Sequence, residues 1–157
     1  MTPIHVLLLA LLIGFFAGLR SLTPAAVVTW AAHLGWMKFD RPLAWMASAV
    51  AVGFFTILAL VELVTDKLPK TPARTAPPGL IARILLGALA GSAVAMAGAQ
   101  AVMAGAALGI VGALIGTFGG YQARTRLVRA LGMPGYVVAV LEDLLTIGGS
   151  LWVVSRF

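Results

Sequence analysis

Forty consecutive residues, 84–123, contain no Lys, Arg, Asp or Glu, and this run restricts the fold more than any other feature. As one helix it would extend about 60 Å, at 1.5 Å per residue, whereas the hydrocarbon core of a bilayer is about 30 Å thick. The run therefore predicts two membrane crossings joined by a tight turn within residues 97–105, a segment that contains Gln100.

Composition supports a membrane protein. Of the 157 residues, 61% are hydrophobic and 10% are charged, whereas a soluble domain carries about 25% charged residues. The chain has no cysteine, which excludes disulfides and thiolate metal sites. Its net charge of +6 comes from basic residues that lie between apolar runs, so it predicts membrane topology and not nucleic-acid binding.

Three further crossings are predicted by uncharged runs at residues 2–19 and 42–61 and by an apolar segment at 134–155. We therefore expect an all-α integral membrane protein with about five transmembrane helices. All of them belong to a single transmembrane domain over residues 1–157.

Residues 21–41 do not fit this count. Thr23 is a suitable N-cap and Pro24 suits the first helical position, but only about 13 residues follow before Gly35. This length predicts a short re-entrant helix, or an interfacial one anchored by Trp30 and Trp36. If the segment crossed fully, the chain would have six spans.

The distribution of Lys and Arg predicts the orientation in the membrane. With five spans, seven basic residues fall on one side and four on the other, so the first side is expected to be cytoplasmic. The N-terminus is then cytoplasmic and the C-terminus lies outside. The seven are Lys67, Lys70, Arg74, Arg83, Arg124, Arg126 and Arg129; the four are Arg20, Lys38, Arg41 and Arg156.

Two glycine-rich stretches, residues 14–30 and 116–132, resemble each other. At an offset of 102 residues, residues 12–23 and 114–125 share six identities, and with five spans the two stretches would cross in opposite directions. This pattern is typical of an inverted-topology repeat, with half-repeats at 1–66 and 79–157. The alternative is close helix packing through small residues. The positions assigned to helix breaks or packing are Gly14, Gly18, Thr23, Pro24, Gly116 and Gly120.

Adjacent acids, Glu142 and Asp143, are the most informative residues. If both stood at the mouth of the last helix, only 14 residues would remain to cross, so at least one must lie inside the bilayer. Intramembrane acids are costly and mark ion or proton sites, although a structural ion pair with an arginine such as Arg83 or Arg124 is the alternative. Side chains of neighbours on a helix point about 100° apart, so the pair cannot simply share one partner.

A second acidic pair, Glu62 and Asp66, is spaced i, i+4 and occupies one face of the second crossing. The segment that follows, residues 66–78, is a stiff basic loop with four of the eight prolines. Its Arg74, together with Arg20 and Arg124, is suited to an anionic lipid or a phosphate-bearing solute.

The motifs GLRSLTP, DKLPKTPARTAPP and GGYQARTRL, with a later ED, resemble a family of small bacterial inner-membrane proteins catalogued as a domain of unknown function (DUF4126-like). The resemblance covers nearly the whole chain. It implies a multi-span membrane protein and supplies no substrate or site residues.

The residues favour a small transporter or channel for an anionic or phosphate-bearing solute or lipid, coupled by intramembrane carboxylates. A non-catalytic assembly subunit is the first alternative. An intramembrane lipid-phosphate enzyme is the second, and it is disfavoured because the sequence lacks cysteine, an HExxH motif and a Ser/His/Asp cluster. We expect no cofactor, no metal and no nucleic acid. The expected partners are the bilayer and, because five spans make a slender bundle, a second copy in a homodimer.

Overall fold

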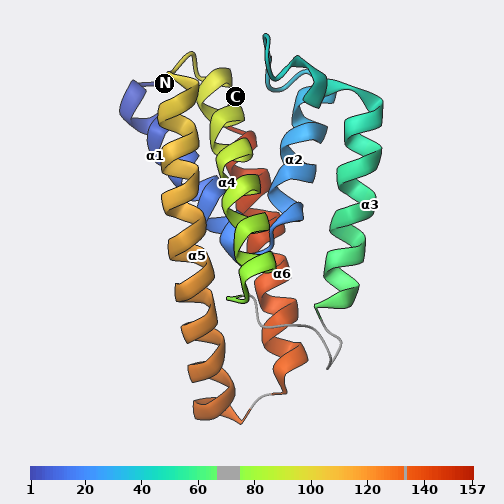
Figure 1. Cartoon of the computed structure of the whole chain (residues 1–157), viewed down its shortest axis with the longest axis vertical. Coiled ribbons are helices and arrows are strands. Elements are labelled where there is room, and N and C mark those ends of the chain that lie inside the picture. The colour runs from blue at the N-terminus through green and yellow to red at the C-terminus, as the bar shows by residue number, and fades with distance from the viewer. Residues whose placement is uncertain (67–74, 133) are drawn as a thin grey trace.

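The computed structural model describes residues 1–66, 75–132 and 134–157, and the regular structure within these ranges is entirely helical. The helices form an elongated bundle with α5 and α6 extending furthest at one end (Figure 1). The elements are α1 (Pro3–Leu19), α2 (Leu22–His33), the short 3₁₀ helix η1 (Ala44–Ala47), α3 (Ala49–Thr65), α4 (Pro77–Ala97), α5 (Val102–Leu131) and α6 (Gly135–Val154).

The long uncharged run folds as the sequence predicts. It supplies most of α4 and α5, and the turn between them lies at residues 98–101, within the expected segment. The apolar segment at 134–155 forms α6, with Pro134 as N-cap and Ser155 as C-cap. The second predicted crossing begins later than expected, because residues 42–48 form η1 and its flanks before α3 starts.

Three helices, α4, α5 and α6, are long and apolar enough to cross a membrane. Helices α1 and α3 are also apolar but have only 17 residues each. The chain is therefore an all-helical membrane protein, while the predicted count of five crossings is not established by these lengths.

The helical structure is interrupted between α1 and α2, inside the bundle. Helix α1 descends from the N-terminal end, turns at Arg20 and Ser21, and α2 returns toward the same end (Figure 1). Most of α2 is buried, and it packs against α3 and α6. The two helices thus form a helical hairpin inside the bundle, and whether α2 is re-entrant or interfacial stays a prediction.

The predicted start of α2 is wrong by two residues. The helix begins at Leu22 with Ser21 as its N-cap, so Thr23 and Pro24 lie within the first turn. Proline is tolerated there because the first N–H groups of a helix have no intrahelical partner. The helix starts early because a carboxylate from α3 satisfies its first N–H groups, as the site geometry below shows.

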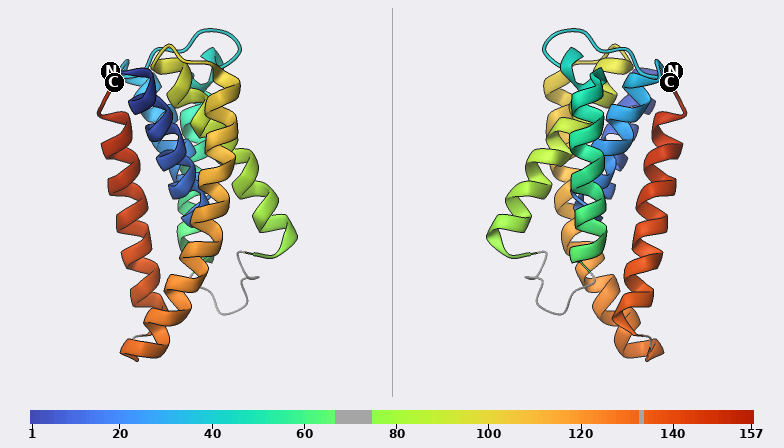
Figure 2. Two further views of the ribbon diagram at one scale, coloured as in Figure 1. Left: turned by 90° about the vertical axis from the view of Figure 1, so that its left-hand side faces the viewer. Right: turned by 90° about the vertical axis from the view of Figure 1, so that its right-hand side faces the viewer.

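Both termini lie at the same end of the bundle (Figures 1 and 2). Successive helices alternate in direction, so that α1, α3 and α5 run away from this end while α2, α4 and α6 run toward it. An odd number of crossings would separate the termini. The prediction that the N- and C-termini lie on opposite sides therefore does not agree with the arrangement of the helices.

The parts of the two stretches that contain the shared glycines, residues 14–19 in α1 and 116–131 in α5, run parallel, so the inverted repeat predicted from them is not confirmed. Gly14 of α1 faces Gly109 of α5, and further along both helices Gly18 faces Gly116. Stretches that run in the same direction cannot be partners in an inverted repeat. Their shared glycines instead serve one close crossing, where a Cβ on Gly116 would lie 2.9 Å from the carbonyl carbon of Phe15. The half-repeats 1–66 and 79–157 stay a prediction.

The interfaces between the helices of the bundle differ in extent. Helices α1, α4 and α5 share the most extensive interfaces, whereas α3 packs chiefly on α2 and η1. Beyond these contacts, α3 is held to the rest of the bundle by the side chains of Glu62 and Asp66 at its C-terminal end. The position of α3 therefore depends on its packing against α2 together with these polar interactions.

All four tryptophans occur near the end of the bundle that carries the termini. Trp30, Trp36 and Trp45 are in the α2–η1 region and Trp152 is in the last turn of α6; each is about half exposed. Tryptophan is enriched at membrane–water interfaces, where its apolar ring and polar N–H meet both environments. This end is therefore suited to one face of a membrane.

Candidate functional site

Arg20, at the break between α1 and α2, is the centre of a buried ion cluster. Its side chain is 0% exposed, and its guanidinium pairs with Asp66 just beyond α3 and with Asp143 of α6. The distance from Nη2 to Oδ1 of Asp143 is 2.6 Å, and the same nitrogen donates to the carbonyl oxygen of Ala139 at 3.5 Å. One cation therefore joins three segments that are far apart in the sequence.

Glu62 of α3 caps the N-terminus of α2. Its Oε1 accepts from the backbone N–H of Ser21 at 2.7 Å and from the Ser21 hydroxyl, and its Oε2 accepts from the N–H of Leu22 at 2.9 Å. A carboxylate is favourable here because it satisfies orphan N–H groups and complements the positive end of the helix dipole.

On the other side of this break, hydrogen-bond donors satisfy the C-terminus of α1. The carbonyl oxygen of Gly18, in the last turn of α1, accepts from Nε of Arg83 at 3.2 Å and from the hydroxyl of Thr117 at 3.3 Å. Arg83 is 6% exposed and also donates to the carbonyl of Gly79 at 3.1 Å. A cation at a helix C-terminus complements the helix dipole. The C-terminus of α1 therefore has a cationic partner, Arg83, and the N-terminus of α2 has an anionic partner, Glu62.

Glu142 lies next to Asp143 but faces a different cation. Its Oε2 is 3.6 Å from Nη1 of Arg124, whose Nη2 donates to the carbonyl of Gly135 at 3.3 Å. The side chain of Arg124 is 27% exposed, whereas that of Arg20 is 0% exposed. The predicted divergence of the two acids is therefore found, and Glu142 belongs to the more accessible pair.

A row of buried hydroxyl groups extends from the cluster along α6. Thr146 and Ser150 are both 0% exposed and follow Asp143 at i+3 and i+7, on one face of the helix. Their hydroxyls, and that of buried Thr23 on α2, have no hydrogen-bond partner within the described residues. Such groups are typical of positions that bind water or an ion, because an unsatisfied buried hydroxyl is costly.

The cluster lies part-way along α6 and combines acidic and basic side chains. After Asp143, α6 continues for 11 residues, about 17 Å, which is less than the hydrocarbon thickness of about 30 Å. Among the described residues the cluster contains four carboxylates and three arginines. The carboxylates are those of Glu62, Asp66, Glu142 and Asp143, and the cations are Arg20, Arg83 and Arg124.

The fold brings together six of the seven predicted binding residues, namely Glu62, Asp66, Glu142, Asp143, Arg20 and Arg124. The seventh, Arg74, and the rest of the basic segment at 67–74 lie outside the described residues. Among the predicted packing residues, Gly14, Gly18 and Gly116 lie at the close α1–α5 crossing, and Gly120 is buried.

Sequence reasoning missed the roles of Ser21, Arg83, Thr117 and Ser150. Arg83 entered only as a topology marker or a partner for Glu142, although an arginine two turns inside an apolar helix is itself a signal of a buried role. Nothing in the sequence singles out Ser21, Thr117 or Ser150, because small hydroxyl residues are common in membrane helices.

No group of three or more His, Asp or Glu side chains in the described ranges is arranged to hold a metal ion.

The model of the family described as Domain of unknown function (DUF4126) matches residues 7–155, and the chain belongs to this family. No curated protein and no solved structure matches the chain.

Proposed function

We propose that this member of the DUF4126 family is a small membrane transporter that binds a proton or a monovalent cation at the carboxylates around Arg20. The observation that supports the proposal is the convergence of two carboxylates, from different segments, on one fully buried arginine at a helix break. Intramembrane ionisable residues mark proton relays and ion pathways. Broken helices hold the binding sites of many secondary transporters.

The ion pairs favour a cation over the anionic solute expected from the sequence. Arg20 contacts two carboxylates and Arg124 contacts one, so an anion would have to displace an existing partner. A proton or a monovalent cation would instead bind to a carboxylate oxygen.

The same carboxylates provide a means of coupling. Glu62 and Asp66 connect α3 to the hairpin tip, and α3 has few other contacts outside α2 and η1. Neutralising Asp66 would weaken its attraction to Arg20 and loosen α3 and α2 from the α1–α4–α5 unit. A ligand can shift a conformational equilibrium in this way only if it binds the two states differently.

Removal of single carboxyl charges tests this function. Protein reconstituted into vesicles of phosphatidylethanolamine and phosphatidylglycerol is expected to conduct protons under an imposed potential, measured with a trapped pH-sensitive dye. Glu142→Gln and Asp143→Asn should each abolish this flux while the protein stays folded. Asp143→Asn leaves Arg20 paired with Asp66, so this arginine keeps a carboxylate partner.

Asp40→Asn is the matched control, because Asp40 is the one acid outside the cluster and is exposed between α2 and η1. It should conduct like the wild type. Wild-type vesicles that conduct no faster than empty ones, with protons or with sodium or potassium gradients, would contradict the proposal. Full flux in a folded Asp143→Asn protein would contradict it as well.

We propose a topology in which α1 and α2 form a re-entrant hairpin and α3 to α6 cross the membrane. Arg124, Arg126 and Arg129 then lie on the cytoplasmic side with the 66–78 connection, whereas Lys38, Arg41 and Arg156 lie on the other. The side with more basic residues is cytoplasmic. Both termini are therefore placed outside, which changes the side assigned to the N-terminus from the sequence.

Cysteine labelling tests this topology in a chain that has no native cysteine. Cysteines at the exposed positions Thr2 and Ser155 should react with a membrane-impermeant reagent added outside intact cells. A cysteine at exposed Arg126 should react only after the cells are opened. Labelling of Thr2 and Ser155 from opposite sides would restore an odd number of crossings and contradict the proposed topology.

A non-catalytic assembly subunit is the second candidate function, because the close glycine packing of α1, α4 and α5 and the clamped hairpin tip also suit a rigid scaffold. It becomes the preferred function if the folded wild type shows no flux. The lipid-phosphate enzyme requires converging carboxylates at a metal, and the described residues give this alternative no support. The expected homodimer stays a prediction.

A further inference from the structure

Three buried hydroxyl groups near the Arg20 cluster have no hydrogen-bond partner among the described residues. They belong to Thr23 of α2 and to Thr146 and Ser150 of α6. Burial alone does not explain this, because Thr29 of α2 is also 0% exposed and its hydroxyl donates to the carbonyl oxygen of Ala26 at 2.8 Å. The other buried hydroxyls in the described ranges have partners as well; they are those of Ser21, Ser92 and Thr117. The backbone of α2 and α6 therefore leaves these three hydroxyls available to a ligand.

The packing of α2 on α6 brings Thr23 and Thr146 to a similar depth. The two helices contact each other and run toward the end of the bundle that carries the termini (Figure 1). The register between them is set by Arg20 and Asp143, because Nη2 of the arginine lies 2.6 Å from Oδ1 of the aspartate. Thr23 is in the first turn of α2 after Arg20, and Thr146 lies about 4.5 Å beyond Asp143 along α6. Both hydroxyls are thus within about one turn of the ion pair.

The spacing along α6 suits polar groups that are joined by single water molecules. Asp143, Thr146 and Ser150 are related by steps of three and four residues, so their Cβ atoms are about 5–6 Å apart. One bridging water with two hydrogen bonds of about 2.8 Å spans this distance. Internal water binds where several polar groups converge, and the buried Nε of Arg20, which has no partner among the described residues, adds a donor.

This row of groups is suited to a proton and not to a metal cation. Hydroxyl groups and water both donate and accept hydrogen bonds. A proton can therefore pass along the row, because each transfer breaks one O–H bond and forms another at the next oxygen. A cation such as Na⁺ would need several oxygen ligands to replace its hydration shell, and it would also lie close to the guanidinium of Arg20, which repels it.

An apolar layer closes the row at the end of the bundle that carries the termini. Val153 is the next position of the same stripe, three residues after Ser150. It is 0% exposed and belongs to one core cluster with Val28 and Ala31 of α2. Ser155, two residues later, is exposed. Because an apolar constriction excludes water, this layer separates the last hydroxyl from the surface by about one helical turn.

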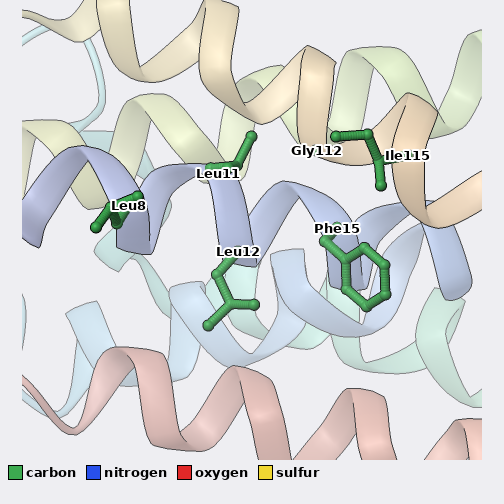
Figure 3. Close-up of a pocket in the computed structure, with 6 residues that line it drawn as sticks. All are labelled: Leu8, Leu11, Leu12, Phe15, Gly112 and Ile115. Atoms are coloured by element: carbon green, nitrogen blue, oxygen red, sulfur yellow. The ribbon is translucent and has the colours of Figure 1, made fainter.

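The apolar pocket on the outer seam of α1 and α5 is not an alternative route. Figure 3 shows that its side chains project from these two helices, and all of them are apolar. Proton transfer requires positioned donors and acceptors, which the side chains of this pocket do not supply. The lining residues are Leu8, Leu11, Leu12, Phe15, Gly112 and Ile115.

We infer that Thr23, Thr146 and Ser150, joined by internal water, form a proton path from Asp143 toward the end that carries the termini, and that Val153 closes this path. The inference rests on the proposed function, and it names the proton as the transported species.

Removal of single hydroxyls tests the path. Thr146→Val and Ser150→Ala each remove a hydroxyl with little change in volume, whereas Thr146→Ser keeps one. Thr29→Val is the matched control, because it removes an equally buried hydroxyl that bonds only to its own helix. Each protein is reconstituted into vesicles of phosphatidylethanolamine and phosphatidylglycerol, and proton flux under an imposed potential is measured with a trapped pH-sensitive dye. Melting temperatures in detergent are measured in parallel.

Thr146→Val and Ser150→Ala should each lower the proton flux about tenfold, because loss of one hydrogen bond of the path raises the barrier by about the 1.4 kcal/mol that corresponds to this factor. Their melting temperatures should not fall, since the changes leave the packing intact. Thr146→Ser should recover most of the flux that Thr146→Val loses. Thr29→Val should conduct like the wild type.

Val153→Thr should have the opposite effect. It keeps the shape of the side chain and extends the row by one hydroxyl, so the flux should rise about tenfold for the same reason. Val94→Thr places the same hydroxyl at an equally buried position of α4 and is the control. It should conduct like the wild type. A folded Val153→Thr protein with wild-type flux would overturn the closure of the path at Val153.

The remaining outcomes separate this inference from the proposed function. If folded Thr146→Val and Ser150→Ala conduct like Thr29→Val while Asp143→Asn conducts nothing, the path is wrong and the proposed function stands. A wild type that conducts Na⁺ or K⁺ but not protons would overturn the path and keep a cation transporter. A wild type without any flux would contradict both. If one of the two hydroxyl variants fails to fold, the other decides, because each removes one link of the same row.

Discussion

Replacing Arg20 with methionine is expected to lower the free energy of unfolding by about 3–5 kcal/mol, because the carboxylates of Asp66 and Asp143 then remain buried without their cation. Methionine fills a similar volume, so the effect arises chiefly from charge. The measurement is the melting temperature and the denaturant midpoint of the purified protein in detergent. Exposed Arg41→Met is the control and should have little effect.

Neutralising the stranded acids should rescue this loss. The triple variant Arg20→Met, Asp66→Asn, Asp143→Asn replaces a buried ion cluster by neutral groups, and such replacements are often neutral or stabilising. We therefore expect it to be more stable than Arg20→Met alone, although it should not conduct protons. Equal stability of the single and triple variants would mean that the ion cluster does not determine the stability at this site.

Replacing Gly109 with alanine is expected to destabilise the bundle by about 3 kcal/mol, at the upper end of overpacking effects. A Cβ at this position would lie 2.9 Å from the carbonyl carbon of Gly87 and 3.2 Å from Cα of Gly91. Both are backbone atoms of α4, so no side chain can rotate away and the helices must separate. A fall in melting temperature in detergent measures the effect.

Gly119→Ala on the same helix is the matched control. A Cβ there meets nothing within 4 Å, and alanine is the better helix former by about 0.5–1 kcal/mol. This variant should therefore be as stable as the wild type or more stable. If Gly109→Ala melted at the same temperature as Gly119→Ala, the close α4–α5 contact would not contribute to stability.

The break between α1 and α2 links these two predictions. Glycine contacts fix α1 against α5 and α4, while charged groups hold the returning helix and α3 to the tip of α1. Backbone that is not helical is tolerated at membrane depth only where the protein buries and satisfies it. Arg83 and Glu62 meet this requirement at the two ends of the break, and Arg20 connects it to α6.

Local sequence determined the helices and the presence of buried charge. The uncharged run at 84–123 predicted α4, α5 and the turn between them, because a membrane limits how far one apolar helix can extend. The position of Glu142 and Asp143 in α6 predicted that at least one of them lies inside the bilayer, which stays a prediction, and the structure buries both side chains. The 100° rotation per residue predicted that they would not share one partner, as found. Length and periodicity are sufficient for conclusions of this kind.

Only the tertiary structure decided where the chain turns and which charges meet. Thr23 looks like the N-cap of α2 in the sequence, but the cap comes from Glu62, 40 residues from Leu22, and local propensity contains no information about so distant a group. The same holds for the direction of the glycine-rich stretches, since small residues favour close packing of either parallel or antiparallel helices. The parallel course of α1 and α5 follows from the helical hairpin that α1 and α2 form, and the pairing of Arg20 with Asp66 and Asp143 depends on this hairpin as well.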